Sequence, residues 1–290
     1  MLATALTLLA AATLSPLYGA PARDPAPAEK PLAAKQAAIR VVLPPPGRRL
    51  PLPLIAGPSD ARRPLVVLDP GHGGVDRGAM ESDGQDEKSL ALGLATALRD
   101  ELVARGRFRV ALTRNGDRLL TLEERTGIAG KLGADLFLSI HLASENSPGE
   151  RGLSIYTQAD RASDPIAQRR AAAENGVDRS RDKVLGRQPL AVNHDARQLS
   201  RQQVRDRSAV FANLVIRQAR GRVRLNARPR RQAPLAVLAG VSAPAVLVEA
   251  GSIGDPDDSK ALGSAAGRAR FAQVAAEAME TYFARLPPER

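Results

Sequence analysis

The chain has 290 residues, of which 43% are hydrophobic and 25% charged, an ordinary composition for a globular protein. It has no cysteine, which excludes disulfide frameworks, thiolate metal sites and cysteine nucleophiles. It has three histidines, so histidine chemistry must use His72, His141 or His194. The formal net charge is +11, and such a charge can attract nucleic acid or an acidic surface. The basic excess lies within residues 161–231, so it describes one segment and not the whole chain.

Residues 1–22 are predicted to be an export signal. Their first 14 residues are apolar, but this run is shorter than the roughly 20 residues that a membrane-spanning helix needs. Ala20-Pro21-Ala22 offers small residues for cleavage, whereas the usual positive start is missing, which leaves a short buried helix as the alternative. We expect a periplasmic or otherwise exported protein whose mature chain has no integral membrane segment.

Residues 23–63 are rich in proline and alanine and are predicted to be a linker. Residues 38–43 within it are a candidate short strand. The catalytic or binding domain is expected to occupy residues 64–286.

From residue 64, apolar strand patterns alternate with helical patterns. Strands are predicted at 65–68, 108–113, 136–141, 152–157 and 245–249. Helices are predicted over 87–105, 121–131, 165–176, about 204–218 and 268–283, and the third of these is expected to stop at Asn175-Gly176. This alternation predicts an α/β fold, a single domain with a mostly parallel twisted sheet and helices on both faces.

Polar residues follow three predicted strands and begin one predicted helix. His72 follows the first strand, His141 ends the third, Glu249 ends the last, and Glu87 begins the first helix. Ligands of α/β proteins gather at the carboxyl ends of strands. Two histidines and a carboxylate form a known set for catalytic zinc, and another carboxylate can serve as general base. The alternative is that both histidines are ordinary loop or core residues.

Four stretches occur in an order and spacing that resemble a known family. They read VVLDPGHGGVDRGA, EKSLAL, ADLFLSIH and PAVLVEAGSIGDPDDSKAL. The chain resembles the zinc-dependent N-acetylmuramoyl-L-alanine amidases, in particular the periplasmic cell-separation amidases, over about residues 64–285. The resemblance implies that His72, Glu87 and His141 bind Zn²⁺ and that Glu249 is the catalytic glutamate. The residues that follow the third ligand and the catalytic glutamate differ from those common in the family. These differences concern the substrate groove.

The implied reaction is hydrolysis of the amide that joins N-acetylmuramic acid to the L-alanine of the peptidoglycan stem peptide. Zinc would polarise the carbonyl and lower the pKa of a water molecule to about 7. Glu249 would accept the water proton and pass it to the departing amine. Asp69 is expected to cap the turn before Gly71, with support of a neighbouring ligand as the alternative.

Two other functions are consistent with a basic, exported chain. A non-catalytic wall-binding or activator protein could retain this fold, but retention of all four site residues argues against it. Nucleic-acid binding is not expected, because the chain has an export-like start and no nucleic-acid motif.

An arginine-rich insertion is predicted at about residues 161–197, where the connection between two elements is unusually long. By resemblance it holds an inhibitory helix that an activator protein displaces. Glu174 is the candidate blocking residue, and Glu150 is the alternative. A surface helix without regulatory role is the competing hypothesis. His194 is expected to face solvent, and the basic residues from Arg197 onward are expected to tether the protein to the anionic envelope.

Overall fold

The computed structural model describes residues 51–80, 84–144, 149–185 and 200–286, and for residues 177–185 it describes the backbone alone. The expected export signal, the candidate strand at 38–43, most of the expected linker and His194 lie outside the described residues. Within the described ranges, no helix combines the length and apolar character needed to cross a membrane.

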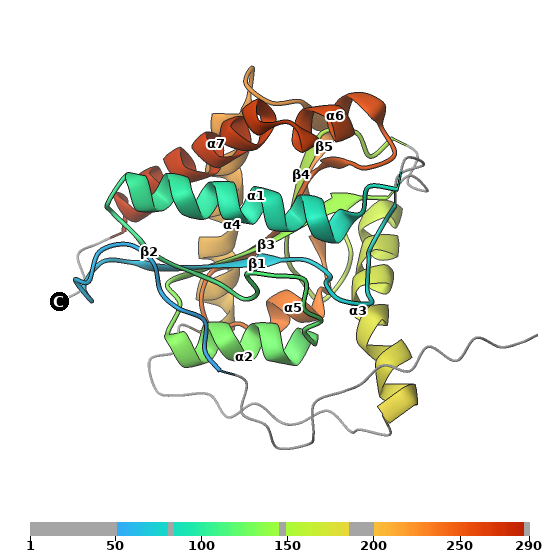
Figure 1. Ribbon diagram of the computed structural model, residues 1–290, viewed down its shortest axis with the longest axis horizontal. Coiled ribbons are helices and arrows are strands. Elements are labelled where there is room, and N and C mark those ends of the chain that lie inside the picture. Colours follow the sequence, from blue (N-terminus) through green and yellow to red (C-terminus); the bar gives the residue numbers. More distant parts are fainter. Residues whose placement is uncertain (1–50, 81–83, 145–148, 186–199, 287–290) are drawn as a thin grey trace, which may run out of the picture. The chain divides into compact units, whose positions relative to one another are not determined.

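Six strands form one sheet in the order β2-β1-β3-β6-β4-β5 (Figure 1). Strands β2, β1, β3 and β6 are mutually parallel, whereas β4 is antiparallel to β6 and parallel to β5. This arrangement confirms the predicted α/β fold with a mostly parallel sheet. The strands are β1 (Leu65–Pro70), β2 (Arg109–Leu112), β3 (Leu136–Ala143), β4 (Leu153–Gln158), β5 (Leu225–Ala233) and β6 (Ala245–Ser252).

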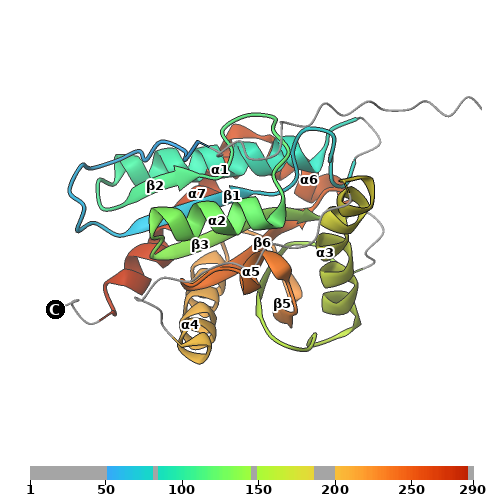
Figure 2. The same ribbon diagram turned by 90° about the horizontal axis from the view of Figure 1, so that it is seen from below.

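Helices cover both faces of the sheet, as predicted (Figures 1 and 2). One face packs against α1 (Glu87–Ala104), α4 (Arg201–Ala219), α6 (Pro256–Gly263) and α7 (Ala265–Phe283). The opposite face packs against α2 (Leu122–Leu132), α3 (Pro165–Leu185) and α5 (Ala236–Ala239). Every residue of β1, β3 and β6 is buried, which explains why these strands are continuous apolar runs in the sequence.

Local signals fix the ends of α2 where the sequence predicts them. The Thr121 hydroxyl accepts a hydrogen bond from the Glu124 amide, and the Glu124 carboxylate accepts one from the Thr121 amide. Gly133 ends the helix in the left-handed conformation, with a φ of 66°.

Several parts of the fold differ from the prediction. The first is β5, whose sequence LNARPRRQA lacks an apolar alternation because it is an edge strand. Its exposed Arg228 and Arg230 flank Pro229, and charge and proline both prevent pairing with another chain. The short helices α5 and α6 were also not predicted.

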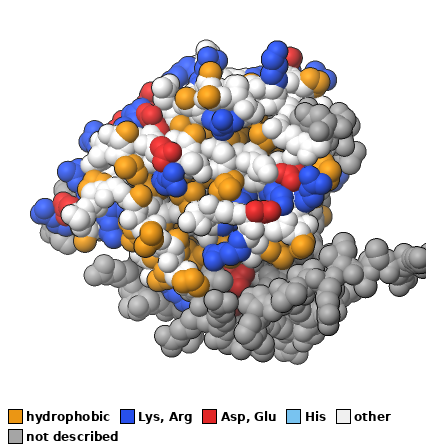
Figure 3. Space-filling model, viewed as in Figure 1, with side chains coloured by type: hydrophobic (Ala, Val, Ile, Leu, Met, Phe, Trp, Pro, Cys, Tyr) orange, Lys and Arg blue, Asp and Glu red, His pale blue; other side chains and the backbone are white. Residues whose placement is uncertain are grey.

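On the face seen in Figure 3, basic side chains are spread among acidic and apolar ones and do not gather in one patch.

Another difference is the length of α3, which continues to Leu185 past the predicted stop at Asn175-Gly176. The Asn175 side chain does not cap the helix. It donates a hydrogen bond to the Pro234 carbonyl (2.7 Å) and accepts one from the Ala236 amide (2.8 Å), so it joins α3 to the start of α5.

Contact with the sheet also begins before residue 64. Ala56 forms an antiparallel bridge with Val110 of β2, with both backbone hydrogen bonds present. The last residues of the expected linker therefore contact the edge of the sheet.

The sheet order places the predicted polar residues at one edge. Strand β3 lies between β1 and β6, so the carboxyl ends of all three strands meet. The register pairs Asp69 with Ser139 and His141 with Glu249. These four residues interrupt the apolar face that packs against α2, α3 and α5, and they place the candidate site there.

Candidate active site

His72 follows β1 in the left-handed conformation, with a φ of 57°, which is uncommon outside glycine. Its Nδ1 lies 2.9 Å from Oδ2 of Asp76. Its Nε2 has no hydrogen-bond partner and lies 3.1 Å from Oε1 of Glu87. Burial alone would lower the pKa of His72, but the carboxylates of Glu87 and Asp76 outweigh burial and hold that pKa well above its usual value. A carboxylate on one ring nitrogen and an unpartnered second nitrogen are typical of a metal-binding histidine.

Glu87 is the first residue of α1 and is fully buried. Its Oε1 accepts a hydrogen bond from the Leu142 amide, and its Oε2 accepts one from the Ala79 amide, both at 3.0 Å. Burial alone would raise the pKa of Glu87, but His72 and His141 hold it well below its usual range. The carboxylate is therefore ionised and fixed by the backbones of two other segments.

His141 comes from β3 and lies edge-on to His72, with ring centroids 4.9 Å apart. Its Nδ1 is 3.1 Å from the same Oε1 of Glu87. Two glycines make room for these rings. A Cβ on Gly71 would lie 2.3 Å from the His141 ring, and a Cβ on Gly78 would lie 2.6 Å from the His72 ring.

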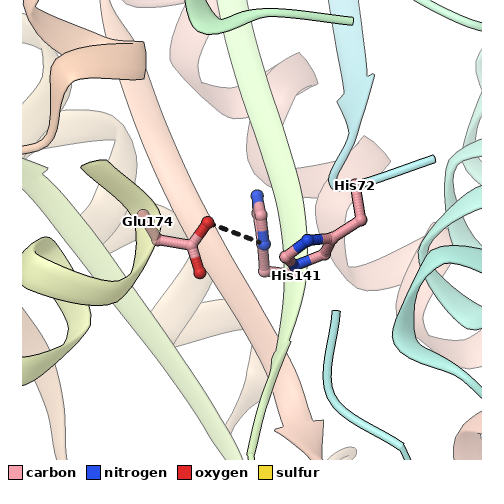
Figure 4. Close-up of side chains that lie close together, drawn as sticks. All are labelled: His72, His141 and Glu174. Carbon is pink, nitrogen blue, oxygen red and sulfur yellow. Dashed lines mark ion pairs between the residues drawn. The ribbon is translucent and has the colours of Figure 1, made fainter. Parts of the chain in front are cut away.

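Helix α3 brings two more charged side chains to the site. Glu174 points toward His141, with Oε2 3.5 Å from Nδ1 (Figure 4). Its Oε1 accepts a hydrogen bond from Nη1 of Arg170, at 2.9 Å. The Arg170 guanidinium also donates to the Leu142 carbonyl and forms an ion pair with Oε1 of Glu249. Both α3 side chains are buried, so the helix closes the site with a carboxylate and a cation.

These side chains are suited to a metal ion. Among the described residues, ligand atoms of His72, His141 and Glu174 lie within 4.8 Å of one another. Glu87 is equally close to both imidazoles, so two carboxylates flank the same pair of rings. The unpartnered Nε2 of His72 and this excess of carboxylates fit a divalent cation. Glu87 is held by backbone amides, whereas the place of Glu174 depends on α3.

Glu249 lies beside His141 in the sheet register and is 1% exposed. Its Oε2 accepts a hydrogen bond from the Tyr156 hydroxyl, at 3.2 Å. Burial raises the pKa of Glu249 to about 7, with Arg170 opposing the shift and Glu150 and Glu174 adding to it. A carboxyl group with this pKa can both accept and donate a proton near neutral pH.

The structure thus gathers His72, Glu87, His141, Glu249 and Glu174, all of which were singled out from the sequence. It places Glu150, the alternative blocking residue, among the charges that act on Glu249, buried and with Oε2 unpartnered.

Three residues of the site were not foreseen. Asp76 is only four residues after His72, and Arg170 is one helical turn before Glu174. Their closeness in the sequence to two candidate site residues is a signal that could have found both. Tyr156 had none, since it is one apolar position in a buried strand.

Asp69 does not cap the turn before Gly71, contrary to the expectation. The Gly71 amide donates to the Ile140 carbonyl instead. The Asp69 carboxylate accepts hydrogen bonds from side chains of three other segments, namely Thr113, Arg125 and Ser139.

Comparisons with known proteins agree on one family. The family model described as N-acetylmuramoyl-L-alanine amidase matches residues 66–281. The chain is 35% identical over 224 residues to the N-acetylmuramoyl-L-alanine amidase AmiA of Escherichia coli, covering 76% of each chain. It is 31% identical over 230 residues to AmiC of Neisseria meningitidis, covering 77% of this chain and 53% of the relative. The solved structure of AmiC2 of Nostoc punctiforme is 26% identical, with a TM-score of 0.53, and the match covers 77% of this chain and 98% of that one.

Substitution of Gly78 tests the space around the two candidate ligands. Gly78 and Gly106 have φ values of 66° and 65°, so alanine at either position has the same left-handed strain of roughly 1 kcal/mol. A Cβ at Gly78 contacts His72 and Glu87, whereas a Cβ at Gly106 has nothing within 4 Å. We expect Gly78→Ala to weaken divalent-metal binding at least tenfold and Gly106→Ala to leave it unchanged, in a metal titration paired with thermal unfolding. Equal metal affinities would show that Gly78 does not shape the site.

Proposed function

The chain belongs to the N-acetylmuramoyl-L-alanine amidase family, and on that premise we propose how its buried site performs the family reaction. The protein is a peptidoglycan hydrolase that cleaves the amide bond between N-acetylmuramic acid and the L-alanine of the stem peptide. The observation that carries the proposal is the position of Glu249, a carboxylate with a pKa of about 7, directly beside His141 in the sheet.

His72, Glu87 and His141 would hold a zinc ion. Two imidazoles and one carboxylate are a donor set of catalytic zinc, and no thiolate is present in the chain. Bound there, zinc supplies Lewis-acid polarisation of the scissile carbonyl and of a water molecule. Asp76 accepts a hydrogen bond from Nδ1 of His72, which leaves Nε2 as the ligand atom.

Glu249 is the proposed general base and acid. The Tyr156 hydroxyl occupies Oε2, which leaves Oε1 as the oxygen that accepts the proton of water and passes it to the departing amine. Arg170 holds this oxygen in the structure, so proton transfer requires that Arg170 first withdraws.

Two substitutions separate metal binding from proton transfer. We expect Glu249→Gln to retain zinc and to lose about 10²–10⁴-fold in activity, since glutamine fills the same space but cannot accept the proton. We expect His72→Ala to lose both zinc and activity, and chelation of the wild-type protein to do the same reversibly. The measurements are release of soluble fragments from purified sacculi and zinc content by elemental analysis.

Glu277→Gln is the matched control, because this carboxylate lies on α7 and pairs with Arg222, away from the site. It should keep both zinc and activity. Loss of zinc from a folded Glu249→Gln protein would contradict the assigned roles. Binding of sacculi without cleavage by the zinc-loaded wild type would favour the non-catalytic wall-binding alternative.

We further propose that α3 keeps the enzyme inactive until a partner displaces it. Amide hydrolysis yields a carboxylate beside the metal ligands and an amine beside the general acid. Glu174 and Arg170 place a carboxylate beside His141 and a cation on Glu249, so α3 occupies the site as the two products would. An activator protein then needs only to bind the open form more tightly than the closed one.

Variants of α3 test the closed form on soluble muropeptide, where wall tethering has no effect. Glu174→Gln and Arg170→Gln each remove one closing contact, and we expect activity to rise at least about tenfold for the pair, which corresponds to ~1.4 kcal/mol. Arg169→Gln is the matched control, because Arg169 is adjacent but exposed. A folded, zinc-loaded double variant no more active than Arg169→Gln would rule out inhibition by α3.

Peptidoglycan as substrate fits an exported protein, and the apolar segment within residues 1–22 supports export to the periplasm or beyond. The basic residues from Arg197 onward would hold the enzyme near the anionic envelope. Nucleic acid is not a proposed partner.

A further inference from the structure

Two buried arginines lie beneath the loop that carries His72, and the proposed reaction uses neither. Arg114 follows β2 and is 2% exposed, and Arg125 belongs to α2 and is 4% exposed. Burial of a guanidinium is costly unless its donors are satisfied. The donors of both arginines are directed largely at backbone carbonyls around the candidate metal ligands.

Arg125 holds His72 through its backbone. Its Nη2 donates to the His72 carbonyl, and its Nη1 donates to the Pro70 carbonyl, both at 2.7 Å. His72 has a left-handed backbone that a non-glycine residue keeps only when its surroundings impose it. The hydrogen bond from Arg125 to the His72 carbonyl is such a restraint.

Arg114 connects the loop of His72 to the helix of Glu87. Its Nη2 donates to the Gly71 carbonyl at 2.7 Å and to the Lys88 carbonyl at 2.8 Å, and its Nε donates to the Pro70 carbonyl at 3.1 Å. Lys88 directly follows Glu87 in the first turn of α1. One guanidinium therefore spans the two segments that supply the first and second candidate ligands.

Asp69 anchors Arg125 to the sheet and lies near Arg114. Its carboxylate is fully buried, accepts from Arg125 at 2.8 Å, and also accepts from Thr113 at 2.6 Å and Ser139 at 2.9 Å. One carboxylate thus faces two adjacent cations. Burial and the charge of Arg125 lower the pKa of Arg114 to about 10, which still leaves Arg114 charged at neutral pH.

We propose that Arg114 and Arg125 are positioning residues that set the separation and orientation of His72 and Glu87 as metal ligands. This inference rests on the proposed metal centre. Arginine is needed because its planar fork can bridge several carbonyls at once, whereas lysine is a point charge on a flexible stem. Arg114 fixes the distance between the two segments, and Arg125 fixes the backbone of His72.

The test uses Arg114→Lys and Arg125→Lys in the full chain, which keep the charge and remove the bridge. Zinc affinity is measured by competition with a chelator, and site geometry by the visible absorption of the cobalt(II)-substituted protein. We expect zinc affinity to fall about 10–100-fold, as for other groups that orient metal ligands, and the cobalt absorption to change in position or intensity.

Two controls separate positioning from general stability. Arg222→Lys changes an arginine that pairs with Glu277 at a distance from the site. Leu102→Ala destabilises the core between α1 and the sheet without contact to the ligands. Both should keep the wild-type zinc affinity and cobalt spectrum, although Leu102→Ala should melt at a lower temperature. Lysine variants that lose only thermal stability, as Leu102→Ala does, would overturn the proposal.

Should a lysine variant fail to fold, Ser139→Ala provides a milder test, because it removes one hydrogen bond from Asp69 and leaves both arginines in place. Its zinc affinity should fall in the same direction by a smaller factor, and an unchanged affinity and spectrum would count against the proposal. Failure of the proposed function gives a different result, since the wild-type protein itself would then bind no zinc.

Discussion

The buried negative charge at the carboxyl ends of β1, β3 and β6 is the constraint on which the rest of the site depends. Glu87, Glu174 and Glu249 are nearly inaccessible to water, and ionised carboxylates in such a place require compensation. Two histidines and Arg170 supply part of it. A divalent cation among His72, Glu87 and His141 would supply the rest, which makes metal binding a consequence of how the sheet is ordered.

The same constraint bears on the proposed inhibition by α3. Arg170 and Glu174 are paired with each other, so the helix presents a neutral pair to the site. Its removal takes away one cation and one carboxylate together and leaves the total charge of the site unchanged. The cost of opening is then mainly the lost contacts, among them the ion pair between Arg170 and Glu249, and a partner that binds the open form can offset it.

The sequence predicted much of this site because its signals are local. Parallel strands bring their carboxyl ends together, so His72, His141 and Glu249 had to approach one another once the sheet order was right. The capping box at Thr121 and the glycine at 133 likewise act within a few residues. The roles of the ligands, by contrast, came from the family resemblance and not from geometry.

What the sequence could not predict depends on contacts between distant segments. The arginines and the proline of edge strand β5 give it no recognisable strand pattern in the sequence. Helix α3 continues through Asn175-Gly176 because the Asn175 side chain is hydrogen-bonded to Pro234 and Ala236 at the start of α5. The sequence does not distinguish Glu150 from Glu174 as the candidate blocking residue. Only the packing of α3 places Glu174 beside His141.

The most direct measurement is anomalous X-ray diffraction at the zinc edge from crystals of the full-length protein. The account predicts a single ion among the side chains of His72, Glu87 and His141, with α3 seated and Arg170 on Glu249. An ion at another place, or one whose ligands exclude Glu87, would contradict it.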